Sequence, residues 1–269
     1  MKTLQLTVVA LGFVIVGCAS EPQSQPPTWE EFMAQVTIEP ETGVFIVNGD
    51  EMIESEAELA VFYNGMVAQW AGASVGETSD ALIVNRVGSR DDKWSSTTAA
   101  NLTYCVSQSS FGSRYNTVVN AMNSAAAAWE GTARVNFVHR SDQDGNCTAS
   151  NGNVMFDVRQ TSTTSYLARS FFPSTGRSSR NVLISTSSFG NISPYSLAGV
   201  LRHELGHTIG FRHEHTRPEA GTCFEDNSWR ALTSYDSASV MHYPQCNGSN
   251  RGDLVLTSRD KTGARSLYP

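Results

Sequence analysis

The stretch HELGHTIGFRH, residues 203–213, constrains this chain more than any other part of the sequence. On a helix, His203 and His207 lie one turn apart on the same face, so their imidazoles can share one metal ion. Gly210 permits a sharp turn that brings in His213 as a third nitrogen donor. Three neutral histidines with one open position form a catalytic zinc geometry, whereas a structural zinc site is closed by four protein ligands. The spacing therefore predicts one catalytic Zn²⁺ ion.

Glu204 lies about 100° round the helix from His203, where it can reach a water molecule without being a ligand itself. We interpret Glu204 as a general base. The competing interpretation is an exposed, histidine-rich helix. In a chain of this composition the five fixed positions would occur together by chance with odds of roughly one in 100,000, and four of the six histidines fall between positions 203 and 215. His215 and His242 have no ligand position in the pattern and are expected to be structural or exposed.

This pattern, HExxHxxGxxH, resembles the signature of the metzincin zinc peptidases. Residues 239–243 (SVMHY) match the methionine-containing turn of that clan in its astacin-like form, SxMHY. Glu214 and Arg217 also match the astacin pattern. Overall the chain is similar to the bacterial dual-action HEIGH metallopeptidases, with Leu205 where that name has isoleucine. The resemblance extends over residues 94–269.

The resemblance implies an α+β fold with a twisted mixed sheet, an antiparallel edge strand and two main helices. In such a fold the zinc helix is followed by a glycine turn and the methionine turn. It implies that Met241 packs beneath the metal and that Tyr243 swings to hydrogen-bond the oxyanion. Residues 166–173 correspond to the edge strand, which would bind an extended peptide; the alternative is an ordinary edge strand. Its substrate-binding residues would be Ala168, Arg169 and Ser170.

Residue periodicity independently indicates an α+β domain, because strands are flanked by two substantial helices. The predicted strands are 102–106, 135–139, 154–159, 166–172 and 181–186, and the predicted helices are 115–129, 193–210 and a last one ending at Leu267. We therefore assign residues 91–269 to one catalytic domain.

A charge asymmetry separates this domain from the segment before it. Residues 19–85 contain twelve acidic side chains and no Lys or Arg, whereas residues 86–269 contain 14 acids and 18 bases. The net charge of −7 and a pI near 5.4 argue against a nucleic-acid binder. We predict an acidic prosegment over residues 19–90 that ends in an exposed, protease-sensitive stretch, residues 86–93.

Asp50 is the candidate inhibitory residue of this prosegment. In astacin-type precursors an aspartate of an FxGD motif occupies the open position of the zinc, and here Asn48-Gly49-Asp50 follows an aromatic strand. The resemblance implies that Asp50 is a metal ligand in the latent form. The alternative is an ordinary Asn-Gly-Asp turn after a strand.

The first 18 residues have the pattern of a bacterial lipoprotein signal peptide, with one lysine, an apolar run and small residues before Cys18. Cys18 would then carry the lipid anchor, which is the expected membrane contact. The alternative is a soluble secretory signal cut after Ala19 or Ser20. Either signal predicts export from a bacterial cell. A lipidated precursor would lie at the envelope, and the processed enzyme would be extracellular.

Four further cysteines favour two disulfides in an exported chain. Three pairings are possible, and we favour the local one, in which each bond closes one part of the catalytic domain. Zinc ligation by thiolates is the competing interpretation, but the chain has no CxxC spacing. The favoured pairs are Cys105–Cys147 and Cys223–Cys246.

Together these observations predict a secreted or lipid-anchored, monomeric zinc endopeptidase that hydrolyses protein peptide bonds and is made as a zymogen. Proteins or peptides would be its partners, and nucleic acid would not. The main alternative is a non-catalytic, zinc-stabilised surface lipoprotein that binds peptides or cell-wall material. The presence of Glu204 argues against it, since a purely structural site has no use for a base there. A non-peptide amide is the other possible substrate class.

Overall fold

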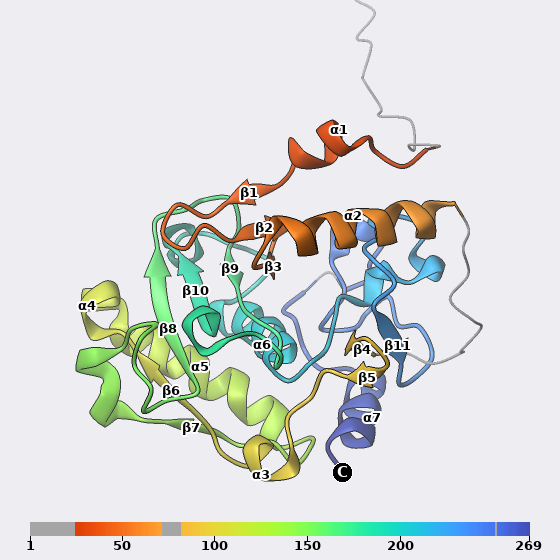
Figure 1. Ribbon diagram of the computed structural model, residues 1–269. Helices are drawn as coiled ribbons and strands as arrows, with labels where there is room; N and C mark the ends of the chain where they lie inside the picture. The colour runs from red at the N-terminus through yellow and green to blue at the C-terminus, as the bar shows by residue number, and fades with distance from the viewer. Residues whose placement is uncertain (1–24, 72–81, 251) are drawn as a thin grey trace, which may run out of the picture.

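The computed structural model describes residues 25–71, 82–250 and 252–269 (Figure 1). The predicted signal peptide and the lipidation residue Cys18 lie outside the described residues. Within the described ranges, every helix is too short or too polar to span a bilayer.

The catalytic domain is built on a five-stranded mixed sheet, as predicted. Its first four strands are mutually parallel, and the fifth pairs antiparallel with its neighbour through Arg169 opposite Leu183. This last strand forms one edge of the sheet. It is shorter than the predicted strand over residues 166–172. The strand order is β7 (Phe137–His139), β6 (Leu102–Val106), β8 (Phe156–Thr161), β10 (Asn181–Ser185) and β9 (Ala168–Arg169).

Two main helices, α5 (Tyr115–Glu130) and α6 (Leu197–Thr208), pack against each other beside this sheet (Figure 1). The side chain of Ser196 caps α6 by accepting a hydrogen bond from the Gly199 amide. The indole of Trp129 is buried at the end of α5 and donates to the Arg202 carbonyl oxygen at 2.8 Å. This contact fixes the position of α6 relative to α5. α6 carries His203 and His207 of the metal-binding pattern. The remaining helices are α3 (Ser96–Ala99), α4 (Gln108–Phe111) and α7 (Ser258–Leu267).

The prosegment forms a small unit of its own, with α2 lying across one side of the catalytic domain (Figure 1). Its elements are α1 (Trp29–Met33), β1 (Thr37–Ile38), β2 (Phe45–Val47), β3 (Glu51–Ile53) and α2 (Glu56–Trp70). The three strands form an antiparallel sheet in the order β1-β2-β3.

Alternate residues of the prosegment strands point to opposite faces of their sheet. Phe45 and Val47 belong to a small core with residues of α2, such as Leu59. Ile46 and Met52 belong instead to the main core of the catalytic domain. The prosegment is therefore attached by a buried apolar face as well as by its charge.

The junction between the two units differs from the prediction. Residues 86–93 were expected to be exposed, and residues 87–90 are, but β4 (Ile83–Val87) and β5 (Arg90–Asp91) form a hairpin there. β4 also pairs with β11 (Trp229–Ala231). Val84 of β4 forms a bridge with Phe211, which lies within the metal-binding pattern. The polar composition of residues 86–93 gave no indication of these strands, because β11, the partner of β4, lies far along the chain. The domain boundary predicted at residue 90 falls inside this hairpin.

Both disulfides have the local pairing. Cys105 is bonded to Cys147, and Cys223 is bonded to Cys246. The first bond joins β6 to the segment after β7. The second joins the loop after α6 to the segment after the methionine turn.

Candidate metal centre

The three histidines of the pattern converge in the structure. His203 and His207 come from α6, and the Nε2 atoms of these two residues lie 3.2 Å apart. The Nε2 atom of His213 lies 3.2 Å from that of His203. Gly210 makes the turn between His207 and His213 with φ of +98°, and a side chain there would collide with the carbonyl oxygen of Asp92. Each histidine is at most 4% exposed.

The opposite ring nitrogen of each histidine faces an acceptor. Nδ1 of His203 lies 2.7 Å from the Val240 carbonyl oxygen, and Nδ1 of His207 lies 2.8 Å from that of Phe211. Nδ1 of His213 lies 2.6 Å from a carboxylate oxygen of Glu225. These contacts place the proton on Nδ1 and leave three Nε2 lone pairs facing one point.

This arrangement fits a zinc ion. Nitrogens 2.0–2.1 Å from a tetrahedral ion lie roughly 3.3 Å from one another, which matches the observed spacing. The same three nitrogens and an oxygen of Asp50 form a buried group of possible metal ligands. Glu204 Oε2 is also buried, and it accepts no hydrogen bond from the described residues.

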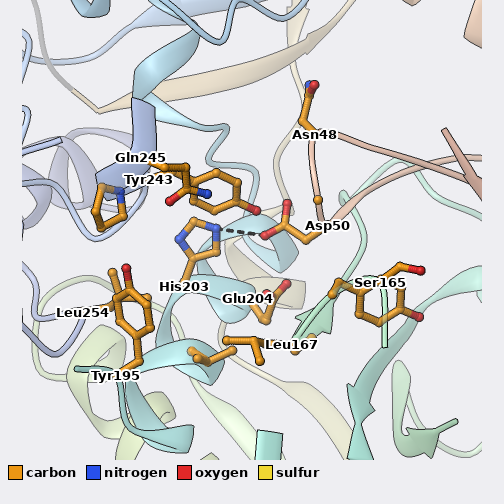
Figure 2. Close-up of a pocket in the computed structure, with 15 residues that line it drawn as sticks. Asn48, Asp50, Ser165, Leu167, Tyr195, His203, Glu204, Tyr243, Gln245 and Leu254 are labelled. Carbon is orange, nitrogen blue, oxygen red and sulfur yellow. Dashed lines mark ion pairs between the residues drawn. The ribbon is translucent and has the colours of Figure 1, made fainter. Parts of the chain in front are cut away.

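Asp50 reaches this point from the prosegment (Figure 2). Its carboxylate oxygens lie 3.0 Å from His213 Nε2 and 3.3 Å from His203 Nε2. Asn48 and Gly49 precede it with φ of 52° and 100°, so the chain turns sharply just before the carboxylate. Burial alone would raise the pKa of Asp50, but His213 and His203 outweigh burial and hold it well below its usual value.

Glu204 lies on one side of His203 and Tyr243 lies on the other (Figure 2). Burial raises the pKa of Glu204 well above its usual value, and the nearby Asp50 charge raises it further. The Tyr243 ring stacks on His203 and contacts His213, with centroid distances of 5.5 and 4.6 Å. Burial, followed by Asp50, raises the pKa of the Tyr243 hydroxyl, so it stays a neutral donor.

Met241 is fully buried next to the zinc helix. A Cβ atom added at Gly206 would collide with the Met241 sulfur and approach Trp129 to 3.1 Å. The methionine thus packs directly against the helix turn between His203 and His207.

The predicted substrate-binding residues of the edge strand are all buried, and Arg169 among them contacts the prosegment directly. The Ser170 hydroxyl donates to the Glu204 carbonyl oxygen at 2.8 Å. Arg169 forms a two-pronged ion pair with Glu39, at 2.9 and 2.5 Å, and the Tyr166 hydroxyl donates to the same carboxylate at 2.5 Å. Sequence reasoning missed Glu39, because nothing local marks it among the twelve acids of its segment.

A cavity of about 250 Å³ opens beside Glu204 and His203 (Figure 2). Its wall is largely apolar or aromatic and comes from the prosegment turn before Asp50, the edge-strand segment, α6 and the segment before it, and the chain between the methionine turn and α7. The residues include Leu167, Tyr195, Val200, Pro244 and Leu254. Only Leu167 lies in a segment that the sequence indicated for substrate binding, because the others come from separate parts of the chain.

A second set of charges lies behind His213. Arg212 contacts Glu51 of the prosegment at 3.0 Å, Glu225 at 3.0 Å, and Asp226. Burial and the neighbouring carboxylates raise the pKa of Glu51 to about 8, although Arg212 opposes the rise. Sequence reasoning missed these acids, since their spacing from the HExxH pattern carries no recognised signal.

Comparison with known proteins gives related peptidases. Human Tolloid-like protein 1 is 31% identical over 159 residues, covering 51% of this chain and 14% of that protein. Blastula protease 10 of Paracentrotus lividus is 34% identical over 92 residues, covering 27% of this chain and 15% of that protein. The chain thus spans only a small part of the length of these relatives.

Two solved structures are also similar. Myroilysin is 18% identical with a TM-score of 0.48, covering 70% of this chain and 98% of that one. High choriolytic enzyme 1, a hatching enzyme zinc-protease from Oryzias latipes, is 20% identical with a TM-score of 0.45, covering 69% and 98%.

Residues 83–227, more than half of the chain, match the family described as dual-action HEIGH metallo-peptidase. The matched range begins at the first residue of β4. It includes α6 and all three histidines, of which His213 follows the helix. The chain belongs to the dual-action HEIGH metallopeptidase family.

Proposed function

We propose that the protein is the zymogen of a zinc endopeptidase that hydrolyses protein peptide bonds. The observation that carries the proposal is the convergence of three histidine Nε2 atoms next to the buried carboxyl group of Glu204. A zinc ion held by His203, His207 and His213 supplies Lewis acidity to a water molecule and to the scissile carbonyl.

Glu204 acts as the general base in this proposal. It takes a proton from the attacking water and returns it to the leaving amine. Its carboxyl group is buried beside the histidines, so it lies where it can exchange a proton with the attacking water and the leaving amine. The neutral Tyr243 hydroxyl donates a hydrogen bond to the tetrahedral oxyanion, and Met241 provides the apolar floor beneath the histidines.

Substrate lies along the edge strand, where backbone groups of Ala168, Arg169 and Ser170 pair with an extended peptide. The cavity beside Glu204 receives the side chain of the residue that carries the leaving nitrogen, because Glu204 must deliver its proton there. The apolar wall of the cavity favours an apolar or aromatic side chain.

The prosegment keeps the enzyme latent by three contacts. Asp50 fills the fourth ligand position beside the three histidines, Glu39 neutralises Arg169 of the edge strand, and Ile46 and Met52 extend the apolar core. Activation then requires a cut before Ile83, since β4 belongs to the catalytic domain and α2 ends at Trp70.

Export completes the proposal. Two disulfides are typical of proteins outside the reducing cytosol. We infer a bacterial lipoprotein signal over residues 1–18, with lipidated Cys18 holding the precursor at the cell envelope. The cut before Ile83 would also release the catalytic domain from that anchor, giving a monomeric extracellular enzyme.

The test is incubation of the processed protein with a mixed peptide library, with and without a chelator. Cleavage that the chelator abolishes, that added Zn²⁺ restores and that Glu204→Gln lacks supports the proposal. Library peptides that bind without being cleaved would instead favour the non-catalytic binding protein. Equal turnover by Glu204→Gln would contradict the role given to that carboxylate.

A further inference from the structure

Glu225 is a fully buried carboxylate that contacts the third histidine of the site from behind. One of its oxygens, Oε1, lies 2.6 Å from His213 Nδ1 and 3.4 Å from His215 Nε2. The other, Oε2, accepts a hydrogen bond from Arg212 at 3.0 Å. A single carboxylate therefore contacts three basic side chains within four residues of the chain, Arg212, His213 and His215.

The position of Glu225 is itself fixed. Its backbone amide donates to the Thr216 hydroxyl at 3.0 Å. Two residues earlier, Cys223 is bonded to Cys246 in the segment after the methionine turn. Asp226, the next residue, shares Arg212 with it. A carboxylate held by backbone, disulfide and guanidinium contacts can define the orientation of an imidazole.

His215 extends these contacts to Tyr243. Its Nδ1 accepts a hydrogen bond from the Tyr243 amide at 3.2 Å, so its proton is on Nε2, which faces Glu225. The His215 ring also stacks on His213 and on Tyr243, with centroid distances of 4.7 and 4.8 Å, and these two rings contact each other at 4.6 Å. Glu225 thus acts on both His213 and the backbone position of Tyr243.

His213, His215 and Glu225 also form a buried group with the composition of a metal site. Both ring nitrogens that face Glu225 carry protons in the arrangement above, so neither has a lone pair for a metal. The group is therefore a hydrogen-bonded support. The Nδ1 atom of His213 faces a carboxylate, whereas the Nδ1 atoms of His203 and His207 face backbone carbonyl oxygens. A carboxylate raises imidazole basicity more than a carbonyl does.

We propose that Glu225 is a positioning residue that sets the zinc affinity of His213 directly and orients Tyr243 through His215. The inference rests on the proposed zinc-peptidase function. It adds a support that the HExxHxxGxxH pattern does not contain.

The first test measures zinc affinity of the full chain by competition with a chromophoric chelator, without any substrate. Glu225→Gln is expected to raise the zinc dissociation constant about 10–100-fold. The matched control is Glu219→Gln, which removes an exposed carboxylate of the same loop that pairs with Arg217, and it should leave the constant unchanged. A Glu225→Gln constant within twofold of the wild-type value would overturn the proposal.

Glu225→Asp provides a second variant, because it keeps the charge beside Arg212 and withdraws the carboxylate from His213 by one methylene. It should fold, with a smaller loss of zinc affinity than Glu225→Gln. If Glu225→Gln does not fold, unchanged affinity in Glu225→Asp overturns the proposal. If the processed wild-type protein cleaves no peptide, and the full chain still binds zinc in this Glu225-dependent way, the peptidase function is rejected and this inference stands.

The second test concerns Tyr243. His215→Phe keeps the stacked ring but removes the acceptor for the Tyr243 amide. In the processed enzyme we expect kcat to fall about tenfold, less than the ~10²–10³-fold expected for loss of an oxyanion donor itself, with KM unchanged. The zinc dissociation constant should change less than in Glu225→Gln. An unchanged kcat would overturn the part of the proposal that concerns Tyr243.

Discussion

The Asp50 carboxylate of the prosegment lies 3.0 Å from Nε2 of His213 in the catalytic domain. Together with the three histidine nitrogens it forms one buried group of possible metal ligands, so Asp50 would fill the fourth ligand position that a water molecule or a substrate needs. The prosegment thus closes the site with one short polar side chain, while its attachment energy comes from contacts elsewhere.

Asp50→Ala should therefore give activity before any cleavage. Truncating one partner of a buried charged contact costs about 2–5 kcal/mol, which corresponds to a rise of roughly thirtyfold or more in the open fraction. Turnover of a peptide substrate by the uncleaved full chain is the measurement. Glu41→Ala, at an exposed position of the same segment, should stay latent, and an equally silent Asp50→Ala protein would contradict the blocking role.

Glu39→Gln should loosen the prosegment without opening the metal site directly. Removing the charge leaves Arg169 buried without its carboxylate, at a cost of about 3–5 kcal/mol. Hydrogen exchange of the α2 amides in the full chain should become faster, whereas Glu41→Gln should leave it unchanged. Exchange as slow as in the wild type would show that the apolar face alone holds the prosegment.

The same contact predicts a pH dependence. Burial would raise the pKa of Glu39, but Arg169, Thr42 and Tyr166 outweigh burial and leave it below the ordinary value of 4.5. A lowered pKa stabilises docking above pH 4.5, and that stability is lost as pH falls through the lowered pKa. The pKa of Asp50 is also lowered, so protonation of Asp50 at low pH weakens docking in the wild type and in Glu39→Gln alike. The protection factors of the α2 amides, which correct for the intrinsic pH dependence of exchange, should therefore fall on acidification more in the wild type than in Glu39→Gln.

Tyr243→Phe should reduce kcat of the processed enzyme by ~10²–10³-fold and leave KM nearly unchanged, because it removes one oxyanion donor. Tyr235→Phe is a matched control, since the Tyr235 hydroxyl contacts His242 instead. Steady-state kinetics on one peptide substrate measure both variants. Equal kcat in Tyr243→Phe and the wild type would refute its assignment as the donor.

Gly206→Ala should destabilise the catalytic domain by about 1–3 kcal/mol, because its Cβ would overlap the Met241 sulfur and crowd Trp129. Urea unfolding of the full chain measures the change. Gly145→Ala offers the contrasting case, as no heavy atom lies within 4 Å of its added Cβ. Similar stability of the two variants would mean that Met241 moves freely away from the helix.

The sequence predicted the parts of this site that depend on local spacing. A helix period of 3.6 residues places His203 and His207 on one face, and the positive φ of Gly210 permits the turn to His213. Alternation and length likewise predicted most strands of the main sheet. Asp50 was suggested by a short motif, and the structure places its carboxylate against the histidines.

Tertiary structure decided the contacts between distant segments. Glu39 reaches Arg169, Glu225 reaches His213 and β4 finds β11 only after the chain has folded, and no periodic signal marks any of the three pairs. Burial gives the two side-chain pairs their strength, because a carboxylate interacts far more strongly with a cation or a hydrogen-bond donor out of water than on the surface. The sequence therefore determined which atoms face the metal position, and the packing of the prosegment and the loop after α6 determined what closes and supports it.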